Sequence, residues 1–244
     1  MNFGIIGDGY AAQRHKKAIK YIGGNLVWIY DPPKYGGDEM EMNLSFASKG
    51  NADWVVITSP NYLHYIHCKM VLRTTEAKII CEKPLCLPWE PIIDDDRINI
   101  CLQLRYIENL PKQAESVRAF MVRNEQFFNS WKGNPKLSGG NFYEFFIHYI
   151  DLAILLNADF EGAVWETGEQ ERKIIISYKQ EIDIMKIDMQ SLYDKMYEEI
   201  LDDNGIKPRD IFYLKYALDK FSNEYGFRKS GVTNRIEIGK DQLR

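Results

Sequence analysis

A lysine that follows a predicted buried strand is the first residue of this sequence suited to chemistry on a ligand. Lys83 comes two residues after the apolar run Ile79–Cys81 and stands between Glu82 and Pro84. A short apolar run of this kind is typical of a strand that is buried on both faces. Ligands of open α/β sheets bind at the carboxyl ends of the strands, which is where this lysine would lie. Taken alone, these residues also fit an ordinary strand end with a solvated ion pair.

A glycine turn near the amino terminus has the spacing that cradles a phosphate. Gly7 and Gly9 follow the apolar run Phe3–Ile6, and Ala12 takes the third position of a GxGxxA pattern. The first glycine permits a tight turn, the second lets the backbone approach a pyrophosphate, and the small third residue allows close helix packing. A helix to about Ile22 completes the strand–turn–helix context that the motif requires.

An aspartate at the end of the second predicted strand suits the ribose of an adenosine. Asp31 follows Asn25–Tyr30 and stands 24 residues beyond Gly7, close to the roughly 20 expected for the ribose-binding carboxylate. A carboxylate here would repel a 2′-phosphate, so the sequence favours NAD over NADP. The alternative is an Asp-Pro-Pro turn, because aspartate initiates turns readily.

Strands and helices that would hold these residues alternate through the first half of the chain. Further strands are predicted over 53–58, 78–81 and 98–105, and helices near 39–48 and over 62–73. Such alternation predicts a parallel sheet with right-handed crossovers. After Pro84 there is only a short proline-rich connection. We therefore expect an α/β Rossmann-type domain over residues 1–110.

The second half of the chain no longer alternates strand and helix in the same regular way. Its pattern predicts a shortened α+β domain with an antiparallel sheet over residues 111–244. Gly139 and Gly140 open a strongly apolar helix. The expected elements are a strand over 116–122, this helix over 141–156, two or three strands within 161–187, helices over 189–201 and 210–221, and a strand over 233–238.

Four motifs in this order resemble the Gfo/Idh/MocA family of NAD(P)-dependent sugar and polyol oxidoreductases. They are GxGxxA with Arg14-His15, SPNYLH at 59–64, CEKPL at 81–85, and GG…HxxD at 139–151. Within the family the resemblance is closest to UDP-N-acetylglucosaminuronate 3-dehydrogenases. That narrower likeness rests on SPNYLHY, CEKPL, LQLR at 102–105, SWKG at 130–133 and YEEIL at 197–201.

The resemblance implies roles for particular residues. Lys83 and His148 would both meet the reacting hydroxyl, with Glu144 one helical turn before the histidine. The residues implied to bind the cofactor are Gly7, Gly9, Tyr10, Ala12, Arg14, Asp31, Ser59, Pro60, Asn61, His64, Glu82, Lys83 and Gln103. The second domain would pack against a partner's, so a homo-oligomer, a dimer or a tetramer, is expected.

Oxidation of a secondary alcohol by NAD needs a base for the hydroxyl proton and exclusion of water. A neutral imidazole with a pKa near ~6.5 suits the base, whereas a lysine near ~10.4 would need desolvation or a neighbouring positive charge. We therefore assign His148 as the base and Lys83 as the hydroxyl-binding group. The reverse assignment stays open. Glu144 would lie on the same helix face as His148 and orient its imidazole.

A nucleotide-linked sugar uronate is polyanionic, so its pocket needs cations. Arg105 at a strand end and Lys132 in SWKG are the candidates, and Trp131 offers an apolar face to a sugar or uracil. Surface loop charge is the alternative for both cations. The residues expected to bind substrate are Lys83, Arg105, Trp131, Lys132, Glu144 and His148.

Composition and charge exclude several classes of function. A net charge of −4 and a pI of about 5.7 argue against a nucleic-acid binder, which needs a basic face. No apolar run approaches the ~20 residues of a membrane span, and the first residues lack the features of a signal peptide. The four cysteines lack CxxC spacing and are expected to be reduced core thiols of a cytoplasmic protein. His64 and His67 lack the further ligands of a zinc site, so no metal is expected.

Several departures from the family keep other interpretations open. The segments 31–53 and 84–98 look abbreviated, Tyr193 stands where relatives tend to carry histidine, and Phe146 replaces a small residue. The alternatives are an oxidoreductase for another sugar or polyol, and a compacted relative that binds NAD or a sugar nucleotide without turnover.

Overall fold

The computed structural model describes residues 1–31, 51–165, 172–179, 181–225 and 234–243. The chain forms two compact units, and each combines two stretches of sequence. Residues 1–103 and 189–211 make the first unit, and residues 104–188 and 212–244 make the second. The helix expected near 39–48 lies outside the described residues. The domain limits at 110 and 111 remain a prediction about which parts fold independently.

The first unit contains a parallel sheet of five strands in the order β2-β1-β3-β4-β5. Its strands are β1 (Asn2–Ile6), β2 (Asn25–Tyr30), β3 (Trp54–Ile57), β4 (Lys78–Glu82) and β5 (Ile98–Cys101). Every residue of β3 and β5 is buried, as expected for strands covered on both faces. The direction of the strand order reverses beside β1, which is the switch point where ligands of such sheets bind. The Rossmann-type part of the predicted fold is confirmed.

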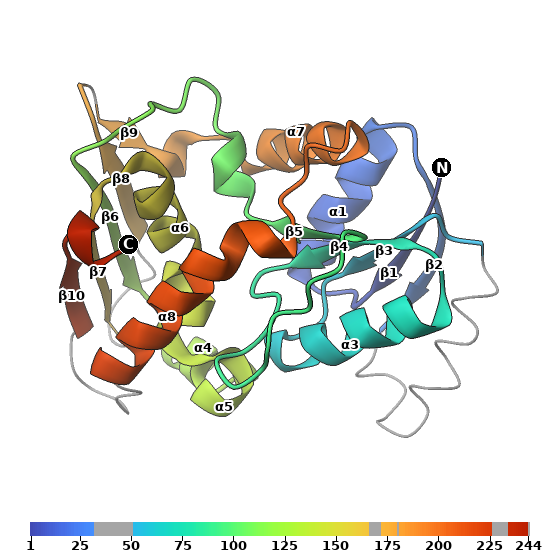
Figure 1. Ribbon diagram of the computed structural model, residues 1–244, viewed down its shortest axis with the longest axis horizontal. Helices are drawn as coiled ribbons and strands as arrows, with labels where there is room; N and C mark the ends of the chain where they lie inside the picture. The colour runs from blue at the N-terminus through green and yellow to red at the C-terminus, as the bar shows by residue number, and fades with distance from the viewer. Residues whose placement is uncertain (32–50, 166–171, 180, 226–233, 244) are drawn as a thin grey trace. The chain divides into compact units, whose positions relative to one another are not determined.

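Helices cover both faces of this sheet. Helix α1 (Tyr10–Tyr21) lies beside α7 (Met189–Leu201), and α3 (Asn61–Thr74) covers the opposite face (Figure 1). Helix α7 buries one stripe, formed by Leu192, Tyr193, Met196, Tyr197 and Ile200. A stripe of this spacing is the apolar face of an amphipathic helix. The late segment of the chain therefore completes the layer that α1 begins.

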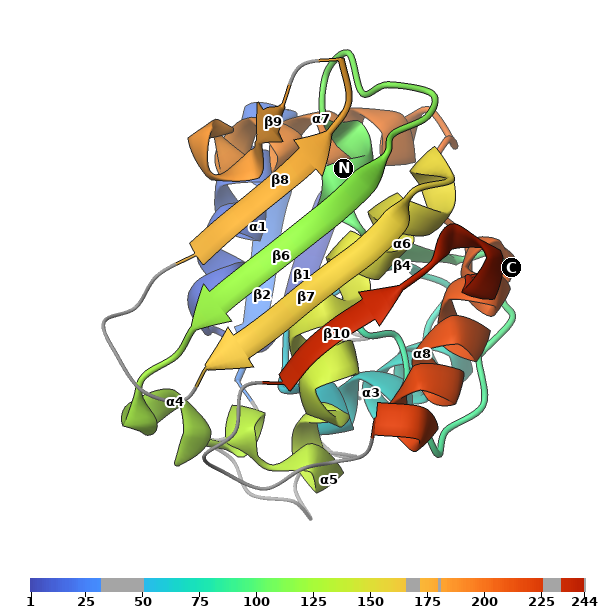
Figure 2. The same ribbon diagram turned by 90° about the vertical axis from the view of Figure 1, so that its left-hand side faces the viewer.

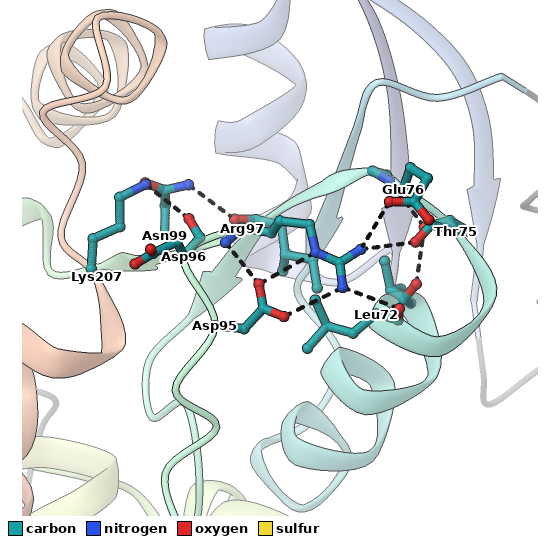
Figure 3. A network of polar contacts seen from close by, with 11 residues as sticks. Leu72, Thr75, Glu76, Asp95, Asp96, Arg97, Asn99 and Lys207 are labelled. Atoms are coloured by element: carbon teal, nitrogen blue, oxygen red, sulfur yellow. Dashed lines mark hydrogen bonds and ion pairs between the residues drawn. The ribbon is translucent and has the colours of Figure 1, made fainter.

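The connection from β4 to β5 contains no helix among its described residues, as the sequence predicted. Arg97 stabilises this connection (Figure 3). Its guanidinium donates to the carbonyl oxygens of Thr75 at 2.9 Å and Leu72 at 3.2 Å, and it also pairs with Asp95. Leu72 lies in the last turn of α3 and Thr75 is the residue that caps it, so the cation lies at the helix C-terminus, where it is favourable. A side chain thus fixes the loop where a crossover helix would otherwise do so.

The strand expected over 98–105 is shorter than predicted. It ends at Cys101, and residues Gln103–Tyr106 form the 3-10 helix η2. The chain turns here because the Leu102 N–H bonds back to the carbonyl of Ile100 at 3.1 Å. On the outer edge of β5, the Ile100 N–H donates to the carbonyl of Ile206 at 2.8 Å. The late segment of the chain thereby covers this sheet edge, which reduces unpaired backbone groups.

The second unit contains a five-stranded sheet in the order β10-β7-β6-β8-β9 (Figure 2). Its strands are β6 (Ser116–Val122), β7 (Asp159–Trp165), β8 (Arg172–Ser177), β9 (Ile182–Asp183) and β10 (Asn234–Ile238). The sheet is mixed, not purely antiparallel as predicted, because β6 and β7 run parallel. A parallel pair needs a crossover, and the helix between these strands supplies it.

That crossover begins with the short helices α4 (Glu125–Phe128), η3 (Trp131–Gly133) and α5 (Pro135–Ser138). The predicted helix over 141–156 is present, but its first part, Phe142–Phe146, is a π-helix, η4, followed by α6 (Ile147–Leu156). Helix α6 packs on β6 and β7 and against α8 (Phe212–Tyr225). Within the described residues, no helix is long and apolar enough to cross a lipid bilayer.

Candidate functional site

The strand ends of the first unit bring several predicted residues into one row. Ile6 pairs with Tyr30 on β2 and with Ile57 on β3, and Ile57 pairs with Cys81 on β4. One residue beyond these pairs, the row across the carboxyl edge of the sheet reads Asp31, Gly7, Thr58, Glu82. The predicted cofactor residues at the ends of β1, β2 and β4 therefore lie along a single edge, which follows from strand register.

The glycine turn has the backbone that its motif requires. Gly7 adopts a φ of +97°, and a Cβ built there would lie 2.7 Å from the Ser59 nitrogen. Only glycine fits such a left-handed, tightly approached position. Gly9 has no neighbouring atom within 4 Å of its missing Cβ, and no side chain caps the helix that starts at Tyr10. The turn therefore leaves open space beside Gly9 and no side-chain cap at the start of α1, as a phosphate at a helix N-terminus requires.

A set of buried polar side chains surrounds Glu82, and we call it the Glu82 cluster: His15, Glu82, Gln103, Tyr193 and Tyr197. The Tyr193 hydroxyl donates to Glu82 Oε1 at 2.6 Å, and His15 Nε2 lies 3.0 Å from the same oxygen. His15 Nδ1 lies 2.8 Å from the Tyr197 hydroxyl, and Gln103 Nε2 donates to the Tyr193 hydroxyl at 3.3 Å. Hydrogen bonds therefore hold the residue before Lys83 in a fixed position.

Burial keeps the tyrosines of this cluster protonated. It raises the pKa of Tyr193 and Tyr197 well above their ordinary value, and the Glu82 carboxylate acts in the same direction. Both hydroxyls therefore retain their protons. A neutral His15 that donates from Nε2 to Glu82 accepts a hydrogen bond from the Tyr197 hydroxyl at Nδ1, so one tautomer satisfies both contacts.

The same cluster contains a group of metal-ligand types. His15, Glu82 and Cys101 offer ligand atoms that lie within 4.8 Å of one another, and all three residues are buried. The histidine and carboxylate atoms already share the hydrogen bonds described above. The arrangement thus works as a hydrogen-bond network without an ion, and the absence of a metal remains a prediction.

His64 connects the loops that follow β3 and β4. The ring is buried, with Nδ1 2.7 Å from the Pro84 carbonyl oxygen and Nε2 2.6 Å from the Ser59 carbonyl oxygen. Burial lowers its pKa, although both carbonyls oppose this shift. A neutral ring donates to only one of the two carbonyls. Its partners are loop backbone, so we expect His64 to position the Ser59 and Lys83-Pro84 loops rather than contact the cofactor itself.

Ser59 and Lys83 stand at the start of these two loops. The Ser59 hydroxyl lies 2.8 Å from His67 Nδ1, and burial lowers the pKa of His67 to about 4. Lys83 is half-buried, and its peptide bond to Pro84 is cis. The two loops that the sequence singled out are therefore held in place by contacts at the end of the sheet.

In the second unit, the helix that carries His148 exposes one narrow face. Within residues 142–150, only Glu144 and His148 are not buried. Glu144 lies in the π-helix η4, and its Oε1 is 3.5 Å from Lys132 Nζ. Short π segments are frequent at functional sites. The structure thus groups three predicted residues, Glu144, His148 and Lys132, on the same part of this unit.

Arg105 has a different environment from the one predicted. Its guanidinium forms two bonds to Asp151, 2.8 Å from Nε to Oδ2 and 2.5 Å from Nη2 to Oδ1. Asp151 is 1% exposed and lies three residues after His148. This bidentate pair fixes η2 to α6. Arg105 therefore has a carboxylate partner within the protein, and a substrate role for it remains a prediction.

The structure adds residues that sequence reasoning missed. His15 was noted only beside Arg14, and Tyr197 only as part of a motif, although both are fully buried. A signal existed for His15, because it shares a helical face with Ala12, Ala18 and Ile19. Arg123, a residue that is 7% exposed, has a comparable signal in the sequence. It continues the alternation of Val117, Ala119 and Met121.

Comparison with a family model supports the first unit's assignment. Residues 1–94 match the model of the oxidoreductase family with an NAD-binding Rossmann fold, GFO_IDH_MocA. The prediction of NAD as cofactor is confirmed at this level. The glycine turn, Asp31, the Ser59 loop and Glu82-Lys83-Pro84 all lie within the matched residues.

Solved structures share the fold of nearly the whole chain. The WlbA (WbpB) dehydrogenase from Thermus thermophilus, in complex with NAD and UDP-GlcNAcA, is 22% identical, with a TM-score of 0.72 over 91% of this chain and 94% of that one. A levoglucosan dehydrogenase with NADH and levoglucosan is 12% identical, with a TM-score of 0.66 over 98% and 99%. The scyllo-inositol dehydrogenase from Lactobacillus casei is 13% identical, with a TM-score of 0.55 over 89% and 94%.

Proposed function

We propose that this chain, whose residues 1–94 carry the NAD-binding Rossmann fold of the Gfo/Idh/MocA oxidoreductase family, is an NAD-dependent dehydrogenase. Its substrate would be a nucleotide-linked amino-sugar uronate such as UDP-N-acetylglucosaminuronate, oxidised at the C3 hydroxyl. The observation that carries the proposal is the row at the sheet edge. It sets a ribose-type carboxylate, a phosphate-type glycine turn and the Glu82-Lys83 strand end side by side.

Bound NAD would supply the acceptor for the carbinol hydrogen, which leaves as hydride, and the other roles belong to the side chains. His148 takes the proton of the substrate hydroxyl, since a neutral imidazole is an effective base near neutral pH. Lys83 holds the same hydroxyl and stabilises the negative charge that develops on its oxygen. Glu144 shares the exposed helix face with His148 and orients its ring. That Lys83 and His148 meet at one substrate is part of this proposal.

Support for the nucleotide-sugar substrate comes from two directions. The WlbA dehydrogenase of Thermus thermophilus was crystallised with NAD and UDP-GlcNAcA, and its fold covers 91% of this chain. The second unit also carries Lys132, whose Nζ lies 3.5 Å from Oε1 of Glu144, one helical turn before His148. A sugar or polyol without a nucleotide is the alternative, favoured by the similar folds of levoglucosan and scyllo-inositol dehydrogenases.

The test measures NADH formation by absorbance with UDP-N-acetylglucosaminuronate, levoglucosan and scyllo-inositol as substrates. We expect turnover with the nucleotide sugar, and a loss of about 100- to 10,000-fold in kcat in both Lys83→Ala and His148→Ala, with NAD affinity retained. Lys78→Ala is the matched control, because this lysine begins the same strand and is exposed.

Full activity of Lys83→Ala would refute the mechanism. Faster turnover of levoglucosan or scyllo-inositol than of the nucleotide sugar would refute the substrate. NAD binding without turnover on any of the three would favour a binding protein over an enzyme. A homo-oligomer and a cytoplasmic location remain predictions, and light scattering tests the first.

A further inference from the structure

An arginine that sequence reasoning did not single out lies at the end of the central strand of the second sheet. Arg123 follows β6 by one residue beyond Val122, and it continues the buried alternation of that strand. Its residue surface is 7% exposed. By this alternation it is on the same face as Met121, the face that α6 covers.

Within the part of the chain that the structure describes, the guanidinium of Arg123 has aromatic neighbours but no acidic partner. Its central carbon lies 5.5 Å from the ring centroid of Phe127 and 5.5 Å from that of Phe145. Its hydrogen bond among the described residues goes to the Met121 sulfur at 3.6 Å, a weak acceptor. It forms no ion pair with any residue in the described parts of the chain. We call Arg123, Phe127 and Phe145 the Arg123 cluster.

This buried cation keeps its charge. Burial lowers the pKa of Arg123 to about 10, with a further contribution from Arg172, so the group is still protonated near neutral pH. Arg172 pairs with Met121 across β6 and β8, which places it on the same face of the sheet. A buried charge without a counter-ion is costly. Two arginines at this end of the sheet therefore favour an anionic ligand.

Other charged groups nearby already have partners. Glu144 acts electrostatically on Arg123, but its carboxylate lies 3.5 Å from Lys132 Nζ. Arg105, the other cation expected to bind substrate, is joined to the buried Asp151. Of the two predicted cations and Arg123, only Arg123 has a guanidinium or ammonium group with no carboxylate partner among the described residues. The cation best able to accept a substrate anion is thus one that the motifs did not indicate.

The place of this cation suggests which anion it binds. The Phe145 ring, whose centroid is 5.5 Å from the Arg123 guanidinium, belongs to a residue that stands between Glu144 and His148 in the sequence. The anion bound here would therefore belong to the part of the substrate close to the reacting hydroxyl. In a nucleotide-linked uronate that anion is the sugar carboxylate, and a guanidinium can grip a carboxylate with two parallel bonds.

We propose that Arg123, whose guanidinium lies over the Phe127 and Phe145 rings, binds the carboxylate of a sugar-acid substrate and so selects uronates over neutral sugars. This inference rests on the proposed function, because it places the carboxylate beside the hydroxyl that His148 deprotonates. Arg172 lies at the exposed end of the same face and draws the anion toward the buried guanidinium.

The test compares ligands that differ only at the carboxylate. Calorimetric titrations of the NAD-loaded protein use UDP-N-acetylglucosaminuronate against UDP-N-acetylglucosamine, and glucuronate against glucose. We expect Arg123→Met to weaken uronate binding about 10- to 100-fold and to change binding of UDP-N-acetylglucosamine less than about 3-fold. Arg123→Lys keeps the positive charge but lacks the two parallel N–H donors of the guanidinium. Its affinity for the uronate should therefore lie between those of the unmodified protein and Arg123→Met.

Arg118→Met is the matched control. Arg118 lies on the same strand but on the other face, and donates to Glu181 at 2.6 Å and to Ser177 at 2.8 Å. Its loss should leave both titrations unchanged. Thermal melting of each variant checks that it folds. If Arg123→Met does not fold, the loss of uronate binding is measured with Arg123→Lys instead.

Three outcomes would overturn the inference. Arg123→Met could bind the uronate as well as the unmodified protein does. Both nucleotide sugars could weaken equally, which would assign Arg123 to the diphosphate. The unmodified protein could bind neither glucuronate nor the nucleotide uronate. If it binds glucuronate through Arg123 but neither nucleotide sugar, the carboxylate site stands and the proposed nucleotide-sugar substrate fails.

Discussion

The Glu82 cluster and the Arg123 cluster are both buried and charged, yet their charged groups differ in the polar partners that the protein provides. In the first unit, Glu82 accepts a hydrogen bond from Tyr193 and contacts His15, which in turn contacts Tyr197. In the second unit, Arg123 faces aromatic rings and a sulfur atom, with no carboxylate partner in the described residues. Among the described residues, the Glu82 charge has protein partners and the Arg123 charge has no carboxylate partner.

This difference distinguishes a structural role at a site from a ligand-binding role. A satisfied network fixes geometry, since each member loses a partner if another is removed. An unsatisfied cation lowers stability by itself and is favourable only with a ligand. We therefore infer that the Glu82 cluster holds the strand end before Lys83 in position, whereas the Arg123 cluster is arranged for binding. Substitutions in each should affect different quantities.

The largest expected effect is on stability, in Glu82→Ala. Removal of the carboxylate leaves His15 and the Tyr193 hydroxyl buried with a lost partner, at a cost of about 1–3 kcal/mol for each. Urea unfolding should show a drop of roughly 2–5 kcal/mol in the free energy of unfolding. Glu198→Ala is the control, because Glu198 also accepts a tyrosine hydroxyl, that of Tyr21, but on the exposed surface. Equal stability of the two variants would contradict a structural role for the cluster.

A smaller, pH-dependent effect is expected in Arg105→Met. Burial raises the pKa of Asp151 while Arg105 opposes that shift, so the charged form already costs stability in the folded protein. A raised carboxyl pKa contributes stability below the unfolded value of about 3.9, and this is lost as the pH rises through the folded value. Without Arg105 the folded pKa rises further, so the variant should melt lower at about pH 8 than at about pH 5.

The control for this pair is Arg118→Met, which breaks a more exposed ion pair with Glu181. Exposed pairs contribute only about 0–1 kcal/mol, and no comparable pH dependence is expected. A melting temperature of Arg105→Met that does not change between the two pH values would show that Asp151 does not depend on this arginine.

The smallest effect on stability is expected in Arg123→Met. Unlike Glu82→Ala, this substitution should not lower the free energy of unfolding. Removal of a buried charge that has no counter-ion among the described residues should leave the free energy of unfolding unchanged or raise it by about 1 kcal/mol. The same urea titration as for Glu82→Ala measures this. A loss of more than about 2 kcal/mol would show that Arg123 is a structural residue like Glu82, with a partner that the contacts described here do not include.

Local patterns predicted most elements because each depends on neighbouring residues. Strand β6 has the predicted bounds and the alternation of buried residues that its sequence shows, and α7 has the bounds predicted from helical spacing. The parallel pairing of β6 with β7 was missed, since it depends on where the helix between them packs. The π-helix before His148 was missed for a similar reason, because its residues have ordinary helical periodicity.

The sequence by itself determined which functional groups stand at the carboxyl edge of the first sheet. The glycine turn, Asp31 and Glu82-Lys83-Pro84 follow predicted strands, and parallel strands must end at a common edge. Only the tertiary structure decided which charges remain available. Arg105 is paired with Asp151, 46 positions away, and His15 meets residues 67 and 182 positions away. Pairing over such separations depends on how distant elements pack, which no local pattern records.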